Sequence, residues 1–217
     1  MNFTIHEVDQ KTPAWLALRA GLVTGSCAGA ILAERKKGTG ELKVRGDLRQ
    51  RLVCERLTKR SLEKQVRSDS LAHGNQTEPD AVAAYEAATG RIVQRVGFIT
   101  HNDIKAGCSP DGFIGEWVGL IEAKCPTSQV HLEYLRAKEI PEEYKGQLLH
   151  TLFVTGAAWV DFVSFDPRFE DPAMQLFIRR LRREDCDLTA YYLALTLFLS
   201  EVDKAVEEAR QLVQVAA

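Results

Sequence analysis

Two carboxylates and a lysine occur close together in the segment SPDGFIGEWVGLIEAKCP, which covers residues 109–126. They are Asp111, Glu122 and Lys124. Two carboxylates can hold a divalent metal ion, which polarises a phosphoryl oxygen and lowers the pKa of a bound water. The lysine can orient or deprotonate that water, or it can neutralise charge on a phosphate. These residue types therefore indicate metal-assisted hydrolysis, provided that the chain brings them together.

The pattern around these residues predicts a β-hairpin that places the two acids side by side. Residues 105–114 and 118–125 have the composition of strands, and glycines mark the turn between them. With the turn centred on the Glu-Trp pair, Asp111 lies opposite Glu122, and opposed residues have Cβ atoms roughly 4.5–5.5 Å apart. A hard cation such as Mg²⁺, or Mn²⁺, fits between two such carboxylates. Side chains alternate along a strand, so Lys124 shares the face of Glu122.

The composition is that of an ordinary globular protein. A chain of 217 residues with 45% hydrophobic residues is long enough to bury a core, and one domain over residues 1–217 is the default expectation. The five cysteines are odd in number and scattered, and the first residues do not resemble a signal peptide. These features predict a cytoplasmic protein with reduced thiols. No uninterrupted run of eighteen or more apolar residues occurs, so we expect no transmembrane helix.

The net charge of −2 is not typical of a nucleic-acid-binding protein. The basic residues are nevertheless clustered, and local fields matter more than the sum when DNA is held in a groove. One cluster runs from residue 35 to residue 51, while acids gather near the C-terminus. Within this cluster Arg45 and Arg49 lie one helical turn apart, which makes them candidates for binding DNA.

The remaining pattern predicts helices first, then a central sheet, then helices, which fits one α/β domain. A capped helix begins at Thr12-Pro13, and in a predicted helix over 44–59 Leu48, Leu52 and Leu57 form an apolar stripe. Further helices are expected from about residue 25 to 34, and over 69–89, 128–138, 141–155 and 184–215. Strands are expected over 91–100, 159–165 and 174–180, in addition to the hairpin.

Several other polar residues have types that suit a phosphate. Arg19 with Thr24 and Ser26 would combine a guanidinium fork, two hydroxyls and a helix N-terminus. The ordinary alternative is a helix arginine followed by an N-cap. Tyr144 and Gln147 lie on one helix face at spacing i, i+3, so both can face the same site.

Five separated blocks of the sequence together resemble a known family. The blocks are Arg19 with TGS (24–26), HGNQTEPDAVAAYE (73–86), SPDG (109–112), IEAKCP (121–126) and YKGQLLHTLFVTG (144–156). Their content and order resemble the phage lambda exonuclease and YqaJ-type viral recombinase family, a branch of the PD-(D/E)xK nucleases. The resemblance spans roughly residues 13–165. It implies a restriction-endonuclease-like core, in which helices flank a central mixed β-sheet.

The resemblance also implies roles for particular residues. Asp111, Glu122 and Glu78 would hold Mg²⁺ together with the backbone carbonyl of Ala123, and Lys124 would position the attacking water. The pocket for a 5′-terminal phosphate would be formed by Arg19, Thr24, Ser26, Ser109 and Gln147. Leu71 would act as a wedge between terminal base pairs, although core packing is an equally good interpretation of a lone leucine. From position alone, Glu78 would be a surface glutamate near a helix start.

The activity that the resemblance implies is metal-dependent 5′-to-3′ digestion of one strand of linear duplex DNA. Family members assemble as ring-shaped homotrimers, and a single-strand annealing protein is the expected partner in phage-type recombination in a bacterial cell. Two alternatives stay open. One is an endonuclease or repair nuclease on the same fold, which would cut circular DNA. The other is a non-catalytic DNA-end clamp, which does not need the two acids and the lysine together.

Overall fold

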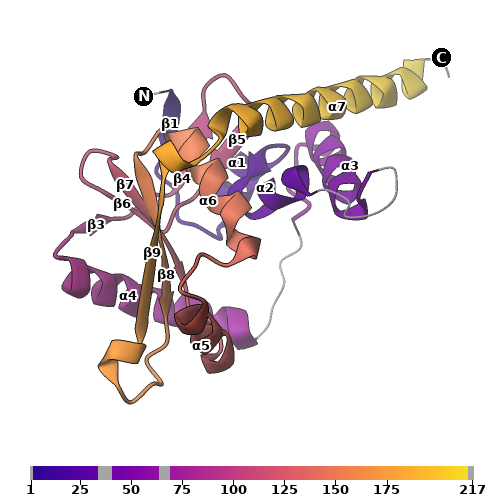
Figure 1. The fold of residues 1–217 in the computed structure, drawn as a ribbon. Helices are drawn as coiled ribbons and strands as arrows, with labels where there is room; N and C mark the ends of the chain where they lie inside the picture. Colours follow the sequence, from indigo (N-terminus) through magenta and orange to yellow (C-terminus); the bar gives the residue numbers. More distant parts are fainter. Residues whose placement is uncertain (1, 34–40, 64–68, 215–217) are drawn as a thin grey trace.

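The computed structural model describes residues 2–33, 41–63 and 69–214, and within the last range the side chains of residues 76–212 (Figure 1). The strands are β1 (Phe3–His6), β2 (Val23–Thr24), β3 (Val93–Gln94), β4 (Phe98–His101), β5 (Ala106–Cys108), β6 (Gly112–Ile114), β7 (Gly119–Lys124), β8 (Trp159–Phe165) and β9 (Leu176–Arg182). The helices are α1 (Pro13–Arg19), α2 (Gly25–Leu32), α3 (Lys43–Thr58), α4 (Asp69–Thr89), α5 (Ser128–Ala137), α6 (Glu142–Thr155) and α7 (Leu188–Gln214).

The strands form two mixed sheets. One sheet has the order β1-β4-β5-β2 and the other the order β3-β6-β7-β8-β9. Two strand pairs are parallel, β2 with β5 and β7 with β8. The other strand pairs in the described part of the chain are antiparallel. The α/β class is therefore confirmed, although two sheets stand where one central sheet was expected.

The chain passes from one sheet to the other at two places where a single strand was predicted. The predicted strand 91–100 is divided into β3 and β4, and the predicted strand 105–114 into β5 and β6. At the first crossing, a Cβ on Gly97 would lie 2.3 Å from the carbonyl oxygen of Val8, so only glycine fits there. At the second crossing, Pro110 has no N–H to donate to a ladder. The catalytic candidate Asp111 is the last residue of this second link.

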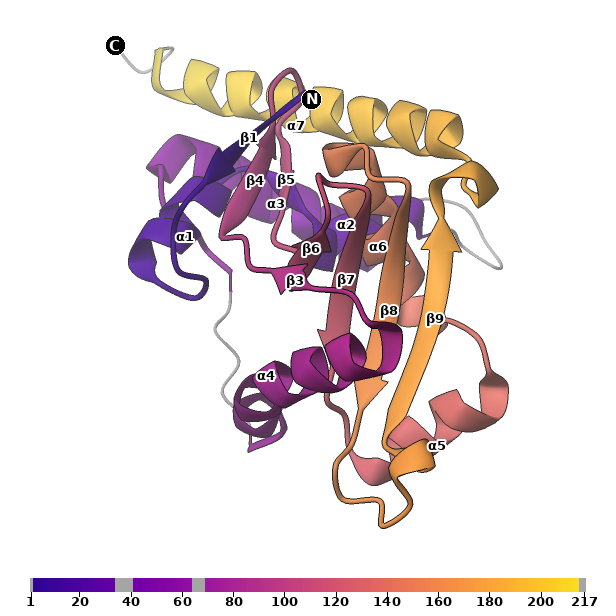
Figure 2. The same cartoon turned by 90° about the vertical axis from the view of Figure 1, so that its left-hand side faces the viewer.

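The five-stranded sheet is covered on both faces (Figure 2). Leu120 of β7 and Val160 of β8 pack against α5 and α6, while Ile121 of β7 and Val163 of β8 pack with residues of α4. This alternation follows from the period of two along a strand. It directs Glu122 and Lys124 toward α6, on the face that the hairpin pattern predicted.

The long helix α7 runs along the top of the molecule and contacts α2, α3 and α6 (Figure 1). Its apolar side, which includes Tyr191 and Phe198, packs with α2, α3 and the four-stranded sheet. The stripe predicted for α3 is wrong at one position: Leu48 and Leu52 are buried, whereas Leu57 is 41% exposed. Among the described residues, no helix is long and apolar enough to cross a membrane.

Most predicted boundaries agree with the structure, and the differences have local causes. Strand β8 begins and ends where expected, and α4 ends before Gly90, whose φ of 66° suits a helix C-terminus. Strand β9 begins two residues later than expected, because residues 172–174 form a 3₁₀ turn that Asp171 caps. The strands β1 and β2 were not predicted, since their pairing partners lie far along the chain.

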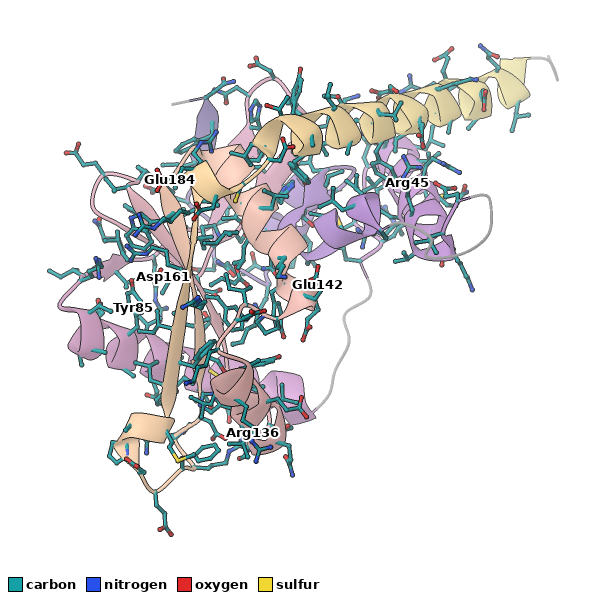
Figure 3. All side chains as sticks on the ribbon, viewed as in Figure 1. Arg45, Tyr85, Arg136, Glu142, Asp161 and Glu184 are labelled. Atoms are coloured by element: carbon teal, nitrogen blue, oxygen red, sulfur yellow. The ribbon has the colours of Figure 1, made fainter. Side chains whose placement is uncertain are left out.

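A buried polar cluster ties α4 to the five-stranded sheet. Asp161 of β8 accepts hydrogen bonds from Arg180 Nε and Nη2, both at 2.8 Å, and from the Tyr85 hydroxyl at 2.7 Å. Tyr85 comes from α4 and is fully buried (Figure 3). The Asp161 carboxylate thus holds α4 against the sheet, because Arg180 and Tyr85 would both be left without an acceptor if it were removed.

We expect Asp161→Ala to lower the free energy of unfolding by about 3 kcal/mol, since it leaves a guanidinium and a buried hydroxyl without an acceptor. Tyr85→Phe removes only one hydroxyl from the same cluster, so its cost should be about 1 kcal/mol. Urea denaturation measures both values. Equal losses in the two variants would contradict this account of the cluster.

Candidate active site

One open hollow gathers most of the residues that the sequence singled out. It lies where the Ser109–Asp111 link, the end of β7, α1, α2 and α6 meet. The predicted residues that line it are Arg19, Ser26, Glu78, Ser109, Asp111, Glu122, Ala123, Lys124, Tyr144 and Gln147. Residues separated by more than a hundred positions in the sequence are thus brought to one place.

The predicted hairpin register is correct. Gly112 pairs with Ile121 in the antiparallel ladder of β6 and β7, and this register, continued by one residue beyond the end of β6, would place Asp111 opposite Glu122. The backbone N–H of Asp111 donates to the Ile121 carbonyl at 3.2 Å. In return, the Asp111 carboxylate accepts the backbone N–H of Ala123 at 2.7 Å. Asp111 is therefore fixed at both its backbone and its side chain.

Glu122 is 3% exposed and presents one satisfied and one unsatisfied oxygen. Its Oε1 accepts hydrogen bonds from Lys124 Nζ and Gln147 Nε2. Its Oε2 is buried and has no hydrogen-bond partner among the described residues. A buried carboxylate oxygen without a partner is costly. A cation beside this oxygen would remove that cost.

The charges in the hollow shift each other's protonation. Burial, together with repulsion from the Glu122 carboxylate, raises the pKa of Asp111 to about 8. Burial lowers the pKa of Lys124, but attraction to Glu122 and Asp111 outweighs it and the net pKa is raised. Of the described cations that line the hollow, Lys124 acts on Asp111 and Glu122, so two acids share one ammonium, a balance that suits a divalent metal beside them.

Glu78 lies at the rim of the hollow, on α4. It forms an ion pair with Lys11 at 3.8 Å, and its side chain is 35% exposed. Among the described residues, no three His, Cys, Asp or Glu side chains already form a group able to hold a metal ion. The charge of Glu78 nevertheless contributes to the raised pKa of Asp111. The structure thus places Glu78 near the two acids but in contact with Lys11, which the sequence analysis did not single out.

The residues that suit a phosphate also lie together. Arg19 is 7% exposed, and its guanidinium stacks over Trp15 with a distance of 3.9 Å to the ring centroid. Its Nη2 donates to Thr24 Oγ1 at 3.3 Å, and Thr24 Oγ1 lies 3.4 Å from Ser26 Oγ. Thr24 is the N-cap of α2, so the helix N-terminus faces the same region. Burial and stacking leave the guanidinium little freedom to move.

Trp15 is a residue of the site that the sequence analysis missed. Besides stacking on Arg19, it donates a hydrogen bond from Nε1 to Ser109 Oγ at 2.8 Å. The signal was present, because an aromatic residue four positions before an arginine on a helix can stack on it. Lys11 was also missed, and no local pattern indicates it. Its backbone has a φ of 67°, which a lysine seldom adopts.

Three of the described residues that were predicted to bind DNA do not line the hollow: Thr24, which is buried next to Arg19, and Arg45 and Arg49. Arg45 and Arg49 both pair with Glu201 of α7 and with Glu41, so they join α3 to α7 (Figure 3). Both arginines are thus held by acids of the same chain, and their role in binding DNA stays a prediction. The side chain of Leu71 lies outside the described residues.

A histidine behind the hollow makes stability depend on pH. His150 is fully buried; its Nε2 donates to the Gly107 carbonyl at 2.9 Å, and its Nδ1 accepts from the Tyr191 hydroxyl at 2.6 Å. Burial lowers the pKa of His150 to about 4. The unfolded chain binds this proton near pH 6.5, so the folded state loses stability as pH falls from about 6.5 to about 4.

We expect this loss to reach about 3 kcal/mol, as measured by urea denaturation across that pH range. His150→Gln has no titrating ring, so its stability curve should be flatter than that of the unchanged protein over the same window. A variant curve with the same slope would show that other groups cause the loss.

The fold and this site define a class, the PD-(D/E)xK nuclease-like α/β proteins; here Asp111 lies directly before β6, and Glu122 and Lys124 lie on the neighbouring strand β7. The sequence profile of the YqaJ-like viral recombinase domain matches residues 14–158, and the chain belongs to this family. No curated protein sequence matches the chain.

Solved structures agree with this assignment. An alkaline exonuclease (LHK-Exo) from Laribacter hongkongensis is 32% identical, with a TM-score of 0.83 over 95% of this chain and 100% of that chain. The structure of LHK-Exo in complex with dAMP is 33% identical, with the same TM-score and coverage. A phage-related exonuclease from Haemophilus somnus 129PT, at 13% identity, has a TM-score of 0.60 over 90% of this chain and 96% of that chain, and so shares the fold.

Proposed function

We propose that the protein is a metal-dependent deoxyribonuclease that digests one strand of linear duplex DNA from its 5′ end and leaves a 3′ single-stranded tail. The observation that carries the proposal is the buried carboxylate of Glu122 and the half-buried carboxylate of Asp111, beside Lys124 in an open hollow. A clamp for DNA ends would gain nothing from two carboxylates that repel each other and would also repel phosphates.

The residues present fit a divalent metal ion. The unpartnered Oε2 of Glu122 and the carboxylate of Asp111 are hard oxygen donors, as Mg²⁺ or Mn²⁺ requires. Ala123 would add its backbone carbonyl, and Glu78 would join after separating from Lys11. When bound, the metal supplies a polarised phosphoryl oxygen and a more acidic water.

The protein's own groups then position the reactants. Lys124 is an ammonium held against Glu122, so it can orient the attacking water or neutralise charge on the scissile phosphate. Gln147 holds the same oxygen of Glu122 and restricts its rotation. Arg19 and Ser26 would bind the terminal 5′ phosphate, which places a DNA end at a fixed distance from the acids.

The proposed partners follow from family membership. The chain would assemble as a ring-shaped homotrimer that encloses duplex DNA, and a single-strand annealing protein would take up the 3′ tail. Ring assembly would explain repeated cleavage without release. Sedimentation of the purified protein tests the oligomeric state independently of activity.

The experiment that tests the proposed activity uses linear duplex DNA with a 5′ phosphate, a closed circle of the same sequence, and either Mg²⁺ or chelator. We expect nucleotides to be released only from the linear DNA and only with Mg²⁺. A label on the 5′ or the 3′ end of one strand shows the polarity, because 5′-to-3′ digestion releases the 5′ label first. Nicking of the circle would favour an endonuclease, and end binding without cleavage would favour a clamp.

A further inference from the structure

The guanidinium proposed to bind the terminal phosphate is occupied by a carboxylate of the same chain. Arg19 Nε donates to Glu63 Oε2 at 3.0 Å, and Arg19 Nη2 donates to Glu63 Oε1 at 2.7 Å. These are two parallel hydrogen bonds between a planar fork and two anionic oxygens. Arginine binds phosphate in the same bidentate manner, so a carboxylate and a phosphate compete for this fork.

Glu63 is placed so that it can leave. Its side chain is 18% exposed, and Arg19 is the described partner of its carboxylate. The residue before it is held separately, because the N–H of Leu62 donates to Glu55 Oε1 at 2.8 Å. The backbone is therefore anchored next to Arg19 while the carboxylate itself depends on the ion pair. Rotation of one side chain is enough to free the fork.

Arg19, by contrast, stays in place when Glu63 leaves. Stacking on Trp15 and the hydrogen bond to Thr24 hold the guanidinium from other sides. The ion pair lies between two hollows that share Ser26: Arg19 lines the hollow of the active site, and Glu63 lines a smaller one beside α3. A phosphate that enters from the active-site hollow can thus bind the Arg19 guanidinium as the Glu63 carboxylate moves into the smaller hollow.

We propose that Glu63 is a built-in substitute for the terminal phosphate, which it replaces on Arg19 between successive cleavage events. This rests on the proposed function of Arg19. A terminal phosphate monoester carries a charge of about −1.5 to −2, so it does not share the fork with a second anion. Each new 5′ phosphate must displace Glu63 on arrival, and Glu63 recovers Arg19 as that phosphate departs. The exchange lowers the affinity for DNA ends and speeds their release.

The test is Glu63→Gln, which keeps the shape and one acceptor oxygen but removes the charge. Binding of duplex with a 5′ phosphate or a 5′ hydroxyl is measured by fluorescence anisotropy in chelator, so that no cleavage is needed. We expect Kd for the phosphorylated duplex to fall about tenfold, since the competing charged pair is gone. Kd for the hydroxyl duplex should not change. With Mg²⁺, the variant should show a lower KM for phosphorylated ends together with a lower kcat.

A matched control and a second readout separate the possible causes. Glu201→Gln also removes a carboxylate paired with arginines, but between α3 and α7, and it should leave both Kd values unchanged. Melting temperatures with and without the phosphorylated duplex show that the variants are folded, and the stabilisation by duplex should be larger in Glu63→Gln.

The outcomes distinguish the two levels of the proposal. A weaker Kd for phosphorylated ends in Glu63→Gln would overturn the exchange, because it would show that Glu63 positions Arg19 for binding. An unchanged Kd of Glu63→Gln for phosphorylated ends would also overturn the exchange. If the unchanged protein does not distinguish the two ends at all, the phosphate role of Arg19 fails instead.

Discussion

Asp111→Asn is expected to abolish cleavage and, in the absence of metal, to make the protein more stable. Burial and the Glu122 carboxylate raise the pKa of Asp111 to about 8, whereas an aspartate in an unfolded chain titrates near 3.9. The folded state thus retains a proton that the unfolded state loses, so stability falls as pH rises from about 4 to about 8. Asparagine carries no such charge and can still accept the N–H of Ala123.

The gain should be about 5 kcal/mol at pH 8, because each unit of pKa shift corresponds to about 1.4 kcal/mol, and it should raise the Tm by roughly 10 °C or more. Thermal unfolding in chelator measures it, and Mg²⁺ should then raise the Tm of the unchanged protein but not of the variant. Asp103→Asn, in an exposed turn after β4, serves as the matched control. A variant less stable than the unchanged protein at pH 8 would contradict the repulsion between the two acids.

Lys124→Ala is expected to reduce kcat by a factor of about 10²–10⁴ while leaving the affinity for DNA ends within a few-fold. Lys124 is held against Glu122, at the place where charge on the scissile phosphate would develop. Binding of the DNA end is assigned to Arg19 instead, so the two properties should separate. Single-turnover cleavage and anisotropy on the same duplex measure them.

Lys145→Ala provides the matched control, because Lys145 lies on α6 with its side chain 49% exposed and pairs with Glu142 on the surface. It should cleave at the unchanged rate. Circular dichroism checks that Lys124→Ala is folded, since removing this cation leaves Glu122 less compensated. Cleavage by Lys124→Ala at the unchanged rate would remove the lysine from the proposed mechanism.

The hairpin at the centre of the site was predictable because it depends on local rules. Alternation along β7 and a turn of known length fix which residues face each other, and the pairing of Gly112 with Ile121 confirms the register. The start of α1 was predictable for the same reason, because Thr12 caps the helix and Pro13 is its first residue. In each case the signal lies within a few residues of the feature.

The features that sequence reasoning missed depend on partners far along the chain. The pairing of Arg45 with Glu201 was not foreseen because the two residues lie 156 positions apart. The pairing of Glu63 with Arg19 was not foreseen either, because they lie 44 positions apart. The pairing of Lys11 with Glu78 is of the same kind. Local patterns thus show which side chains are capable of chemistry, and tertiary structure decides which of them are already occupied.

The passage of the chain between the two sheets has a mechanical consequence. Thr24 accepts a hydrogen bond from Arg19, the residue proposed to bind the DNA end, and it belongs to the four-stranded sheet. Glu122, which is proposed to bind the catalytic metal, belongs to the five-stranded sheet. The Ser109–Asp111 link spans the joint between them, with Ser109 bonded to Trp15 at one end and Asp111 bonded to Ala123 at the other. With Arg19 and the two acids in their proposed roles, this short segment would set the distance along the DNA from the bound 5′ end to the bond that is cut.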